Sequence, residues 1–139
     1  MKIIFTLIFT LPLLLFAQKE IIGKTYGLNG LEIAQFDFPN QMTWDEAVEA
    51  CSKLGPGWRL PTKEEMQEIY QNKSKLCGFV SPVYLADDSQ DLGDNNIYYW
   101  TVSPYGLDHV WVIGLIEEFV AITLKTNQIH TRAVKTVEK

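Results

Sequence analysis

The chain has 139 residues, with 17 acidic and 12 basic side chains and a formal net charge of −5 at pH 7. This acidic balance, without a basic stripe, argues against nucleic acid and anionic membranes as partners. The length suits one domain with a sizeable core.

The first predicted element is a signal peptide over residues 1–17. Lys2 precedes an apolar run over residues 3–16, and Ala17 offers a small residue for cleavage. The run is shorter than the roughly 20 residues that span a bilayer, and no second apolar run follows it. We therefore expect an exported protein without a membrane span, which is periplasmic, at the cell surface or extracellular. Residues 18–139 would form a single domain.

A hairpin and a first helix are expected next. The hairpin covers residues 21–38, with turn-forming residues at 27–30. Thr43 opens the helix, because Glu46 follows it at capping-box spacing. The apolar face of this helix contains Trp44, Ala47, Val48, Cys51 and Leu54. The helix ends at residues 55–57, where Gly-Pro-Gly breaks the hydrogen-bond ladder.

A second helix begins at Thr62, where Glu65 again completes a capping-box pattern, and Met66 and Ile69 lie on its inner face. The remainder is predicted to be loops and strands. The strands are expected at residues 97–101, 109–115, 119–124 and 129–137. Nearly continuous apolar runs such as residues 110–116 indicate strands buried on both faces. Helices followed by strands are typical of an α+β protein.

The two cysteines, Cys51 and Cys77, are an even count in a chain expected to enter an oxidising compartment. A disulfide closing the loop between them would contribute about 3 kcal/mol. The alternative is two buried free thiols, since cysteine is among the most buried residue types.

Several motifs together carry a family resemblance. They are Met42-Thr43-Trp44-Asp45-Glu46-Ala47, Gly57-Trp58-Arg59-Leu60-Pro61-Thr62, Tyr99-Trp100-Thr101 and Val110-Trp111-Val112. In this order they resemble the Lcl C-terminal domain family of exported bacterial proteins, over residues 31–137. The resemblance implies a C-type-lectin-like α+β fold, with two helices packed on a curled, mainly antiparallel sheet. The function of the family is mostly unknown, and adhesion-type binding is suggested for some members.

The chain departs from the family pattern at two places. Thr101-Val102 stands where the family usually has two serines, and Ala133 stands where some members have a cysteine that could pair with the helix cysteine. The latter departure leaves Cys51 with Cys77 or no partner.

Considered by their chemistry, the residues of these motifs have structural roles in our interpretation. Trp58 would fix the connection between the helices on the core by burying a large ring. Trp44 and Trp100 are also predicted to be structural. Arg59 either satisfies a carboxylate or carbonyls nearby or contacts a ligand, and Arg132 is either its structural counterpart or a second ligand contact.

No residue set predicts a catalytic site. His109 and His130 lie in no recognisable nucleophile motif, and two histidines together with cysteines expected in a disulfide leave too few ligands for zinc. The related formylglycine-generating enzymes use a close cysteine pair to bind copper, which Cys51 and Cys77 do not reproduce. We expect no enzyme and no cofactor.

One acidic segment, residues 87–96, is a weak candidate for calcium, with Asp87, Asp91 and Asp94 as ligands. Tyr98 stands where an EF-hand would have its bidentate glutamate, and the sugar-and-calcium triplets of true C-type lectins are missing. A solvated acidic loop is the preferred interpretation.

Aromatic residues are dense between residues 98 and 111. If residues 97–101 form a strand, half of these rings point inward. We expect Trp100 and Trp111 in the core, and Tyr98 and Tyr105 on the surface.

The sequence therefore predicts a non-catalytic exported binding domain for glycan or protein. Its ligand would contact the surface formed by residues 81–108, with Tyr98, Tyr105 and Arg59 as candidate contacts. The alternatives are a structural or assembly module of an envelope complex, and an enzyme whose site the sequence does not reveal.

Overall fold

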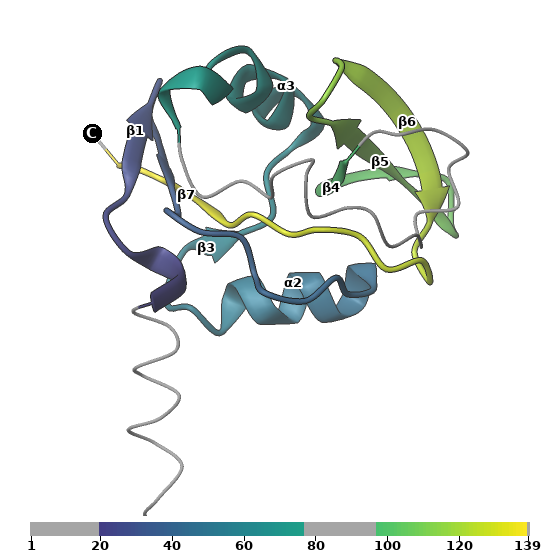
Figure 1. Ribbon diagram of the computed structural model, residues 1–139. Helices are drawn as coiled ribbons and strands as arrows, with labels where there is room; N and C mark the ends of the chain where they lie inside the picture. The colour runs from purple at the N-terminus through teal and green to yellow at the C-terminus, as the bar shows by residue number, and fades with distance from the viewer. Residues whose placement is uncertain (1–19, 77–96, 139) are drawn as a thin grey trace, which may run out of the picture.

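Two antiparallel sheets and two nine-residue helices are the main elements of the part of the chain that the computed structural model describes, residues 20–76 and 97–138, and a short helical turn at residues 20–22 precedes them (Figure 1). The first sheet contains β1 (Tyr26–Leu28), β2 (Leu31–Ile33), β3 (Trp58–Arg59) and β7 (Val134–Thr136). The second contains β4 (Tyr98–Tyr105), β5 (His109–Gly114) and β6 (Phe119–Leu124). The helices are α2 (Trp44–Ser52) and α3 (Lys63–Gln71), with the 3-10 helix η1 (Lys73–Lys75) after α3. The predicted α+β class is confirmed.

The first sheet has the strand order β1-β2-β7-β3, with all neighbours antiparallel. Asn29 and Gly30 both have positive φ angles, 45° and 86°, which suit the tight turn between β1 and β2. The predicted last strand is longer than the observed one. Of the predicted strand at residues 129–137, only β7 pairs within the sheet. Ile129 and His130 form single bridges to Met42 and Tyr99.

Both helices start where the capping patterns predict. The Thr43 hydroxyl accepts a hydrogen bond from the Glu46 N–H (3.4 Å). At α3 the box is complete, because the Thr62 hydroxyl accepts from the Glu65 N–H (3.1 Å) and the Glu65 carboxylate accepts from the Thr62 N–H (2.8 Å). These bonds satisfy N–H groups that the first helical turn leaves free.

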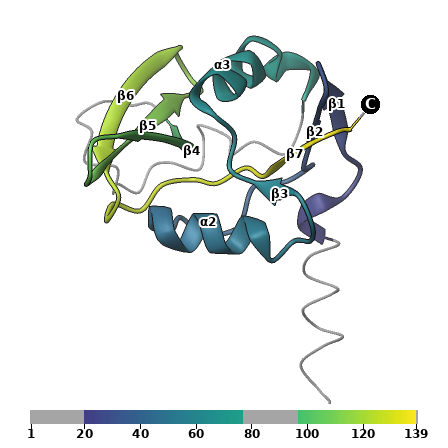
Figure 2. The ribbon, with the colours of Figure 1, turned by 180° about the vertical axis from the view of Figure 1, so that it is seen from behind.

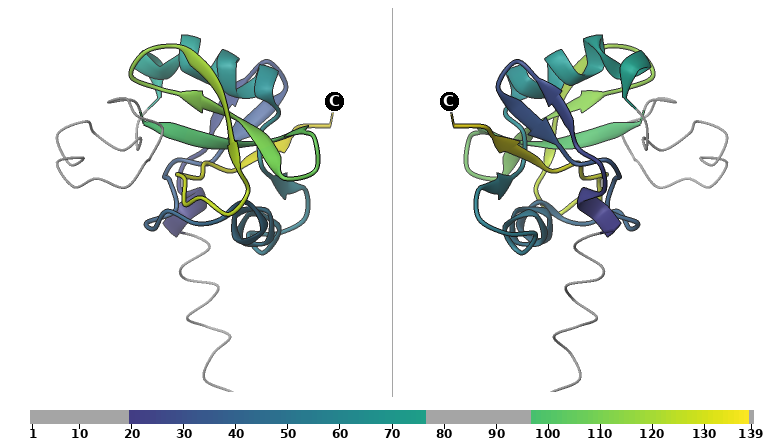
Figure 3. Two further views of the ribbon diagram at one scale, coloured as in Figure 1. Left: turned by 90° about the vertical axis from the view of Figure 1, so that its right-hand side faces the viewer. Right: turned by 90° about the vertical axis from the view of Figure 1, so that its left-hand side faces the viewer.

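The helices lie on opposite sides of β7, so each covers its own core cluster (Figures 1 and 2). The cluster at α2 includes Ala47, Cys51, Leu54, Trp58, Tyr98, Trp100, Val110 and Val112. The cluster at α3 includes Leu31, Ile33, Met66, Ile69, Tyr99, Ile113 and Val134. The side views show α3 above and α2 below the strands (Figure 3).

The second sheet alternates its side chains between these two clusters. Tyr98 and Trp100 lie in the α2 cluster, and Tyr99 lies between them in the α3 cluster. The outer edge of β4 is tied down, because the Trp100 N–H donates to the His130 carbonyl (3.0 Å) and the Val102 N–H donates to the Pro61 carbonyl (2.8 Å). The opposite edge of this sheet is β6.

Within residues 20–76 and 97–138, no helix has the length and apolar character needed to cross a membrane. The predicted signal peptide, residues 1–17, lies outside the described residues.

Candidate binding surface

One face of the second sheet is covered at one end and exposed at the other. Helix α3 packs Met66 and Ile69 against Tyr99 and Ile113 on this face. The helix starts at Lys63, so it covers only the part of the face near Tyr99 and Ile113. Directly opposite residues of antiparallel strands share a face, and the pairs include Trp111 with Ile122. The face therefore continues beyond the helix.

The exposed part of this face is apolar. Tyr105 pairs with His109, and His109 pairs with Leu124, so these side chains share the face with Trp111. The exposed fractions are 50% for Tyr105, 36% for Ile122 and 44% for Leu124, while Leu107 in the adjoining hairpin turn is 90% exposed. We call Tyr105, Leu107, Trp111, Ile122 and Leu124 the outer patch. The partly buried His109 lies between Tyr105 and Leu124, so the surface is largely rather than wholly apolar, and such a surface is typical of an interaction site.

Specific contacts hold the outer patch in place. The Tyr105 and Trp111 rings meet edge to face, with centroids 5.2 Å apart and an interplanar angle of 80°. Lys63 Nζ lies 4.5 Å from the centroid of Trp111, a cation–π contact. The Lys63 N–H also donates to Ser103 Oγ (2.9 Å), which fixes the start of α3 on β4. These contacts hold the Trp111 ring between Tyr105 and Lys63, and Lys63 brings a positive charge to the border of the patch.

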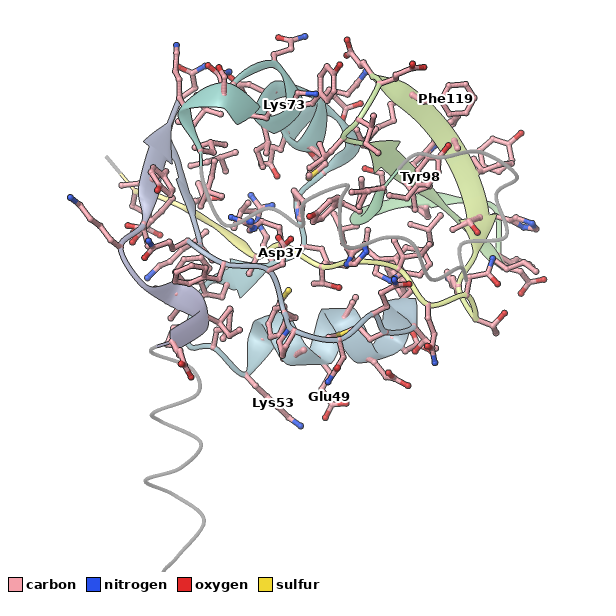
Figure 4. The ribbon with its side chains drawn as sticks, viewed as in Figure 1. Asp37, Glu49, Lys53, Lys73, Tyr98 and Phe119 are labelled. Carbon is pink, nitrogen blue, oxygen red and sulfur yellow. The ribbon has the colours of Figure 1, made fainter. Side chains whose placement is uncertain are left out.

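A group of hydrogen-bonded polar side chains lies in the interior of the protein, away from the outer patch. Arg132 Nε donates to Asp37 Oδ1 (2.6 Å), and Arg132 Nη1 donates to the carbonyls of Ala34 (2.9 Å) and Gln35 (2.8 Å). The Tyr99 hydroxyl donates to Asp37 Oδ2 (2.5 Å). The Arg132 and Asp37 side chains are 0% and 5% exposed, and Figure 4 shows Asp37 in the interior. Arg132 therefore has the structural role and is not placed to contact a ligand.

His130 lies beside this ion pair and is also buried. Its ring is 5.6 Å from that of Tyr99, and its Nε2 is 3.3 Å from Gln41 Nε2. Burial lowers the pKa of His130, and the nearby Asp37 opposes this effect only in part. A buried, neutral histidine hydrogen-bonded to an amide fits a core role better than a catalytic one.

Arg59 is held by the scaffold rather than presented to a ligand. Its guanidinium makes two bonds to the Glu65 carboxylate (2.8 and 2.9 Å) and donates to Thr136 Oγ1 (2.8 Å). The hydrogen bond to Glu65 raises the pKa of Arg59. Burial opposes ionisation of Glu65, but its bonds with Arg59 and Thr62 outweigh burial and lower its pKa. Of the two predicted roles, the structural one matches this geometry.

The expectation that Tyr98 is on the surface and Trp111 in the core is wrong. Tyr98 is fully buried, packed edge to face against Phe119 (6.5 Å; Figure 4). Trp111 is partly exposed in the outer patch. The reason is the two-residue period of a strand, which places Tyr98 on the same face as Trp100, and Trp111 opposite Val110 and Val112. Tyr105 is exposed, as expected.

The three structural tryptophans occupy different environments. Trp58 is 8% exposed, and Trp100 is fully buried with its Nε1 donating to the Met42 carbonyl (2.7 Å). Trp44 is only partly buried. Its Nε1 donates to the Thr101 carbonyl (3.0 Å), and Lys125 Nζ lies 4.7 Å from its ring.

The predicted disulfide is not formed at Cys51, which carries a free, fully buried thiol on the inner side of α2. Burial raises the pKa of this thiol to about 12, so that it stays protonated. Cys77 lies outside the described residues, as do the calcium candidates Asp87, Asp91 and Asp94. Residues 81–96, which form most of the predicted binding surface at residues 81–108, also lie outside the described residues.

The structure also contains a hollow of about 490 Å³ along the end of β7. Its lining is mixed, with charged residues such as Glu32, Lys135 and Glu138 beside the apolar Pro56 and Val137. Charges of both signs line it, and the outer patch residues do not contribute to it. Among residues 20–76 and 97–138, no group of three or more His, Cys, Asp or Glu side chains is arranged to hold a metal ion.

Comparisons with known proteins agree with this architecture. Botrocetin, known from a crystal structure, matches with a TM-score of 0.52 and 12% identity, over 84% of this chain and 98% of botrocetin. Botrocetin in its complex with a mutant von Willebrand factor A1 domain has a TM-score of 0.49, 16% identity, and coverage of 83% and 98%. EMS16, described as an antagonist of the collagen receptor integrin α2β1, has a TM-score of 0.48, 16% identity, and coverage of 82% and 97%.

At these identities the structural likeness concerns the fold alone, which is C-type-lectin-like, as predicted. A search of curated proteins finds no match. The family model of the Lcl C-terminal domain matches residues 24–135. This match covers both helices and all seven strands except the last residue of β7. The chain therefore belongs to the Lcl C-terminal domain family.

Proposed function

We propose that this protein is an exported, non-catalytic binding module that recognises a protein partner through the outer patch. The observation that carries this proposal is the largely apolar sheet face beyond the start of α3, where Tyr105, Ile122 and Leu124 are exposed on one face and Leu107 is exposed in the adjoining turn. A strand scaffold with fixed aromatic contacts binds without paying much entropy to order its own side chains.

The chemistry of the patch favours protein over glycan. Its centre combines an aromatic pair with the aliphatic side chains of Ile122 and Leu124, which suit the apolar core of a protein interface. Lys63 lies over the Trp111 ring and competes for the surface on which a sugar would stack. Lys63 at the border would favour a partner with an acidic or aromatic group at the matching position.

A glycan ligand is the second candidate, because the half-exposed Tyr105 ring offers a stacking surface at the edge of the patch. An assembly role in an envelope complex would use the same patch, with another chain of that complex as the partner. Adhesion-type binding, suggested for some members of the family, is compatible with either ligand class. Removal of residues 1–17 on export and independence from calcium and other cofactors are part of the proposal.

The experiment compares binding of the purified domain, residues 18–139, on a protein array and on a glycan array. The test variant is Tyr105→Ala combined with Leu107→Asp, two exposed changes that leave the core intact. The matched control is Val137→Asp, because Val137 is 48% exposed and lies outside the outer patch.

We expect binding to a defined set of proteins, reduced at least tenfold by the patch variant and unchanged by the control. A tenfold loss corresponds to about 1.4 kcal/mol. Protein binding that survives the patch variant would overturn the proposal. Binding to glycans alone, lost in the patch variant, would support the second candidate in its place.

A further inference from the structure

Strand β6 is an edge strand with an unusual composition. It reads Phe-Val-Ala-Ile-Thr-Leu, without a charge or a proline. Sheet edges normally carry such residues, because unpaired N–H and C=O groups otherwise recruit another strand. Phe119, Ile122 and Leu124 are 53%, 36% and 44% exposed.

The hydrogen-bond pattern shows which groups of β6 face outward. The Lys125 N–H donates to the Asp108 carbonyl (2.9 Å), one pair beyond the end of the β5–β6 register. Hydrogen-bonded pairs alternate along an antiparallel ladder, so residues 119, 121 and 123 bond to β5. The N–H and C=O of Val120 and Ile122 therefore point to the free edge, together with the N–H of Leu124. Within the described residues, no backbone hydrogen bond reaches these groups.

We propose that this edge pairs with β6 of a second copy of the chain, antiparallel, to form a continuous six-stranded sheet in a symmetric dimer. The pattern is self-complementary, because Ile122 opposite its own counterpart exchanges both N–H···O bonds, and Val120 then meets Leu124. The charges at the two ends of β6 also favour antiparallel pairing with a second copy of the chain. Glu117 and Glu118 precede β6 and Lys125 follows it, so antiparallel pairing brings opposite charges together and parallel pairing would not.

The dimer would change how the outer patch works. Directly opposite residues in an antiparallel pair share a face, so both outer patches would lie on the same face of the joined sheet. Two patches on one face bind a repetitive or clustered partner with higher avidity than either alone. This pairing does not depend on the proposed ligand class, and its failure would leave the binding proposal standing.

The first test is sedimentation equilibrium of the domain, residues 18–139, over about 1 to 500 µM, a range that covers weak interfaces. The variant Ile122→Pro removes an outward N–H together with the Ile122 side chain, but none of the β5–β6 hydrogen bonds, so it spares the ladder while blocking the pairing. Ile122→Lys is a second variant that keeps the N–H and places like charges near the two-fold axis. Val137→Asp is the control, an exposed apolar residue away from β6.

We expect a monomer–dimer equilibrium for the wild type and for Val137→Asp. The dissociation constant of the dimer should be at least tenfold higher for both Ile122 variants. A wild-type monomer at all concentrations would overturn the proposal, as would dimers that survive both variants.

Amide hydrogen exchange gives a second readout that side-chain docking alone would not produce. The amides of Val120 and Ile122 should gain protection as the concentration rises, while those of Ala121 and Thr123 are protected throughout. Dimerisation without added protection at Val120 and Ile122 would place the interface elsewhere and contradict the pairing.

Discussion

Replacing Asp37 by alanine should destabilise the protein more than any surface change. Asp37 neutralises the charge of Arg132, whose side chain is 0% exposed, and it also accepts a hydrogen bond from the Tyr99 hydroxyl. Its removal leaves a buried guanidinium without its counter-ion, which costs about 3–5 kcal/mol. Since a domain of this size has a total free energy of unfolding of about 5–15 kcal/mol, the loss is a large share of it.

The matched control is Glu49→Ala. Glu49 also forms an ion pair, with Lys53 at 2.9 Å, but the two side chains are 67% and 62% exposed on the outside of α2 (Figure 4). Exposed pairs of this spacing contribute about 0.3–0.5 kcal/mol. Asp37→Asn adds a second comparison, because it keeps the side-chain volume and removes the charge.

The assay is urea unfolding followed by tryptophan fluorescence, with free energies obtained by linear extrapolation. We expect Asp37→Ala to lose about 3–5 kcal/mol and Glu49→Ala less than about 1 kcal/mol. Equal and small losses in both variants would refute the view that Asp37 stabilises the interior by pairing with Arg132 and by accepting the hydrogen bond from Tyr99 on β4.

Three further predictions concern single residues. Native protein at pH 8 should resist alkylation at Cys51 and react there after unfolding, because burial raises the pKa of this thiol to about 12; a Cys51–Cys77 linked peptide in a non-reducing digest would contradict the free thiol. His130 has a lowered pKa, so the unfolded chain binds its proton first, and the free energy of unfolding should fall as the pH drops below about 6.5, with a slope of up to about 1.4 kcal/mol per pH unit. His130→Gln should flatten this slope, and an unchanged pH profile of stability would exclude His130 as its source. Trp58→Ala should cost about 3–5 kcal/mol in the same urea assay, because it empties a core site, and a near-neutral result would remove its structural role.

Local signals predicted the helices well. Thr43 and Thr62, with glutamates three residues later, marked both helix starts, because capping depends on residues close in sequence. The α+β class and the family fold followed from the order of elements and from the motifs around Trp58.

Non-local features were not predictable in the same way. Asp37 and Arg132 are separated by 95 positions, and no local pattern indicates that they pair. The outer patch was missed because the apolar run through Trp111 was interpreted as buried along its whole length. The alternation was available in the sequence, and applying it from Val110 and Val112 would have turned Trp111 outward. How far α3 covers the sheet depends on tertiary packing, which the sequence pattern does not reveal.

The most direct test of the outer patch as a binding surface is an NMR titration of the isotopically labelled domain with the strongest protein found on the array. Chemical-shift changes should centre on Tyr105, Leu107, Trp111, Ile122 and Leu124, with the Trp111 indole among the largest. Changes centred on the hollow at Lys135 and Val137, with the outer patch unaffected, would contradict the account.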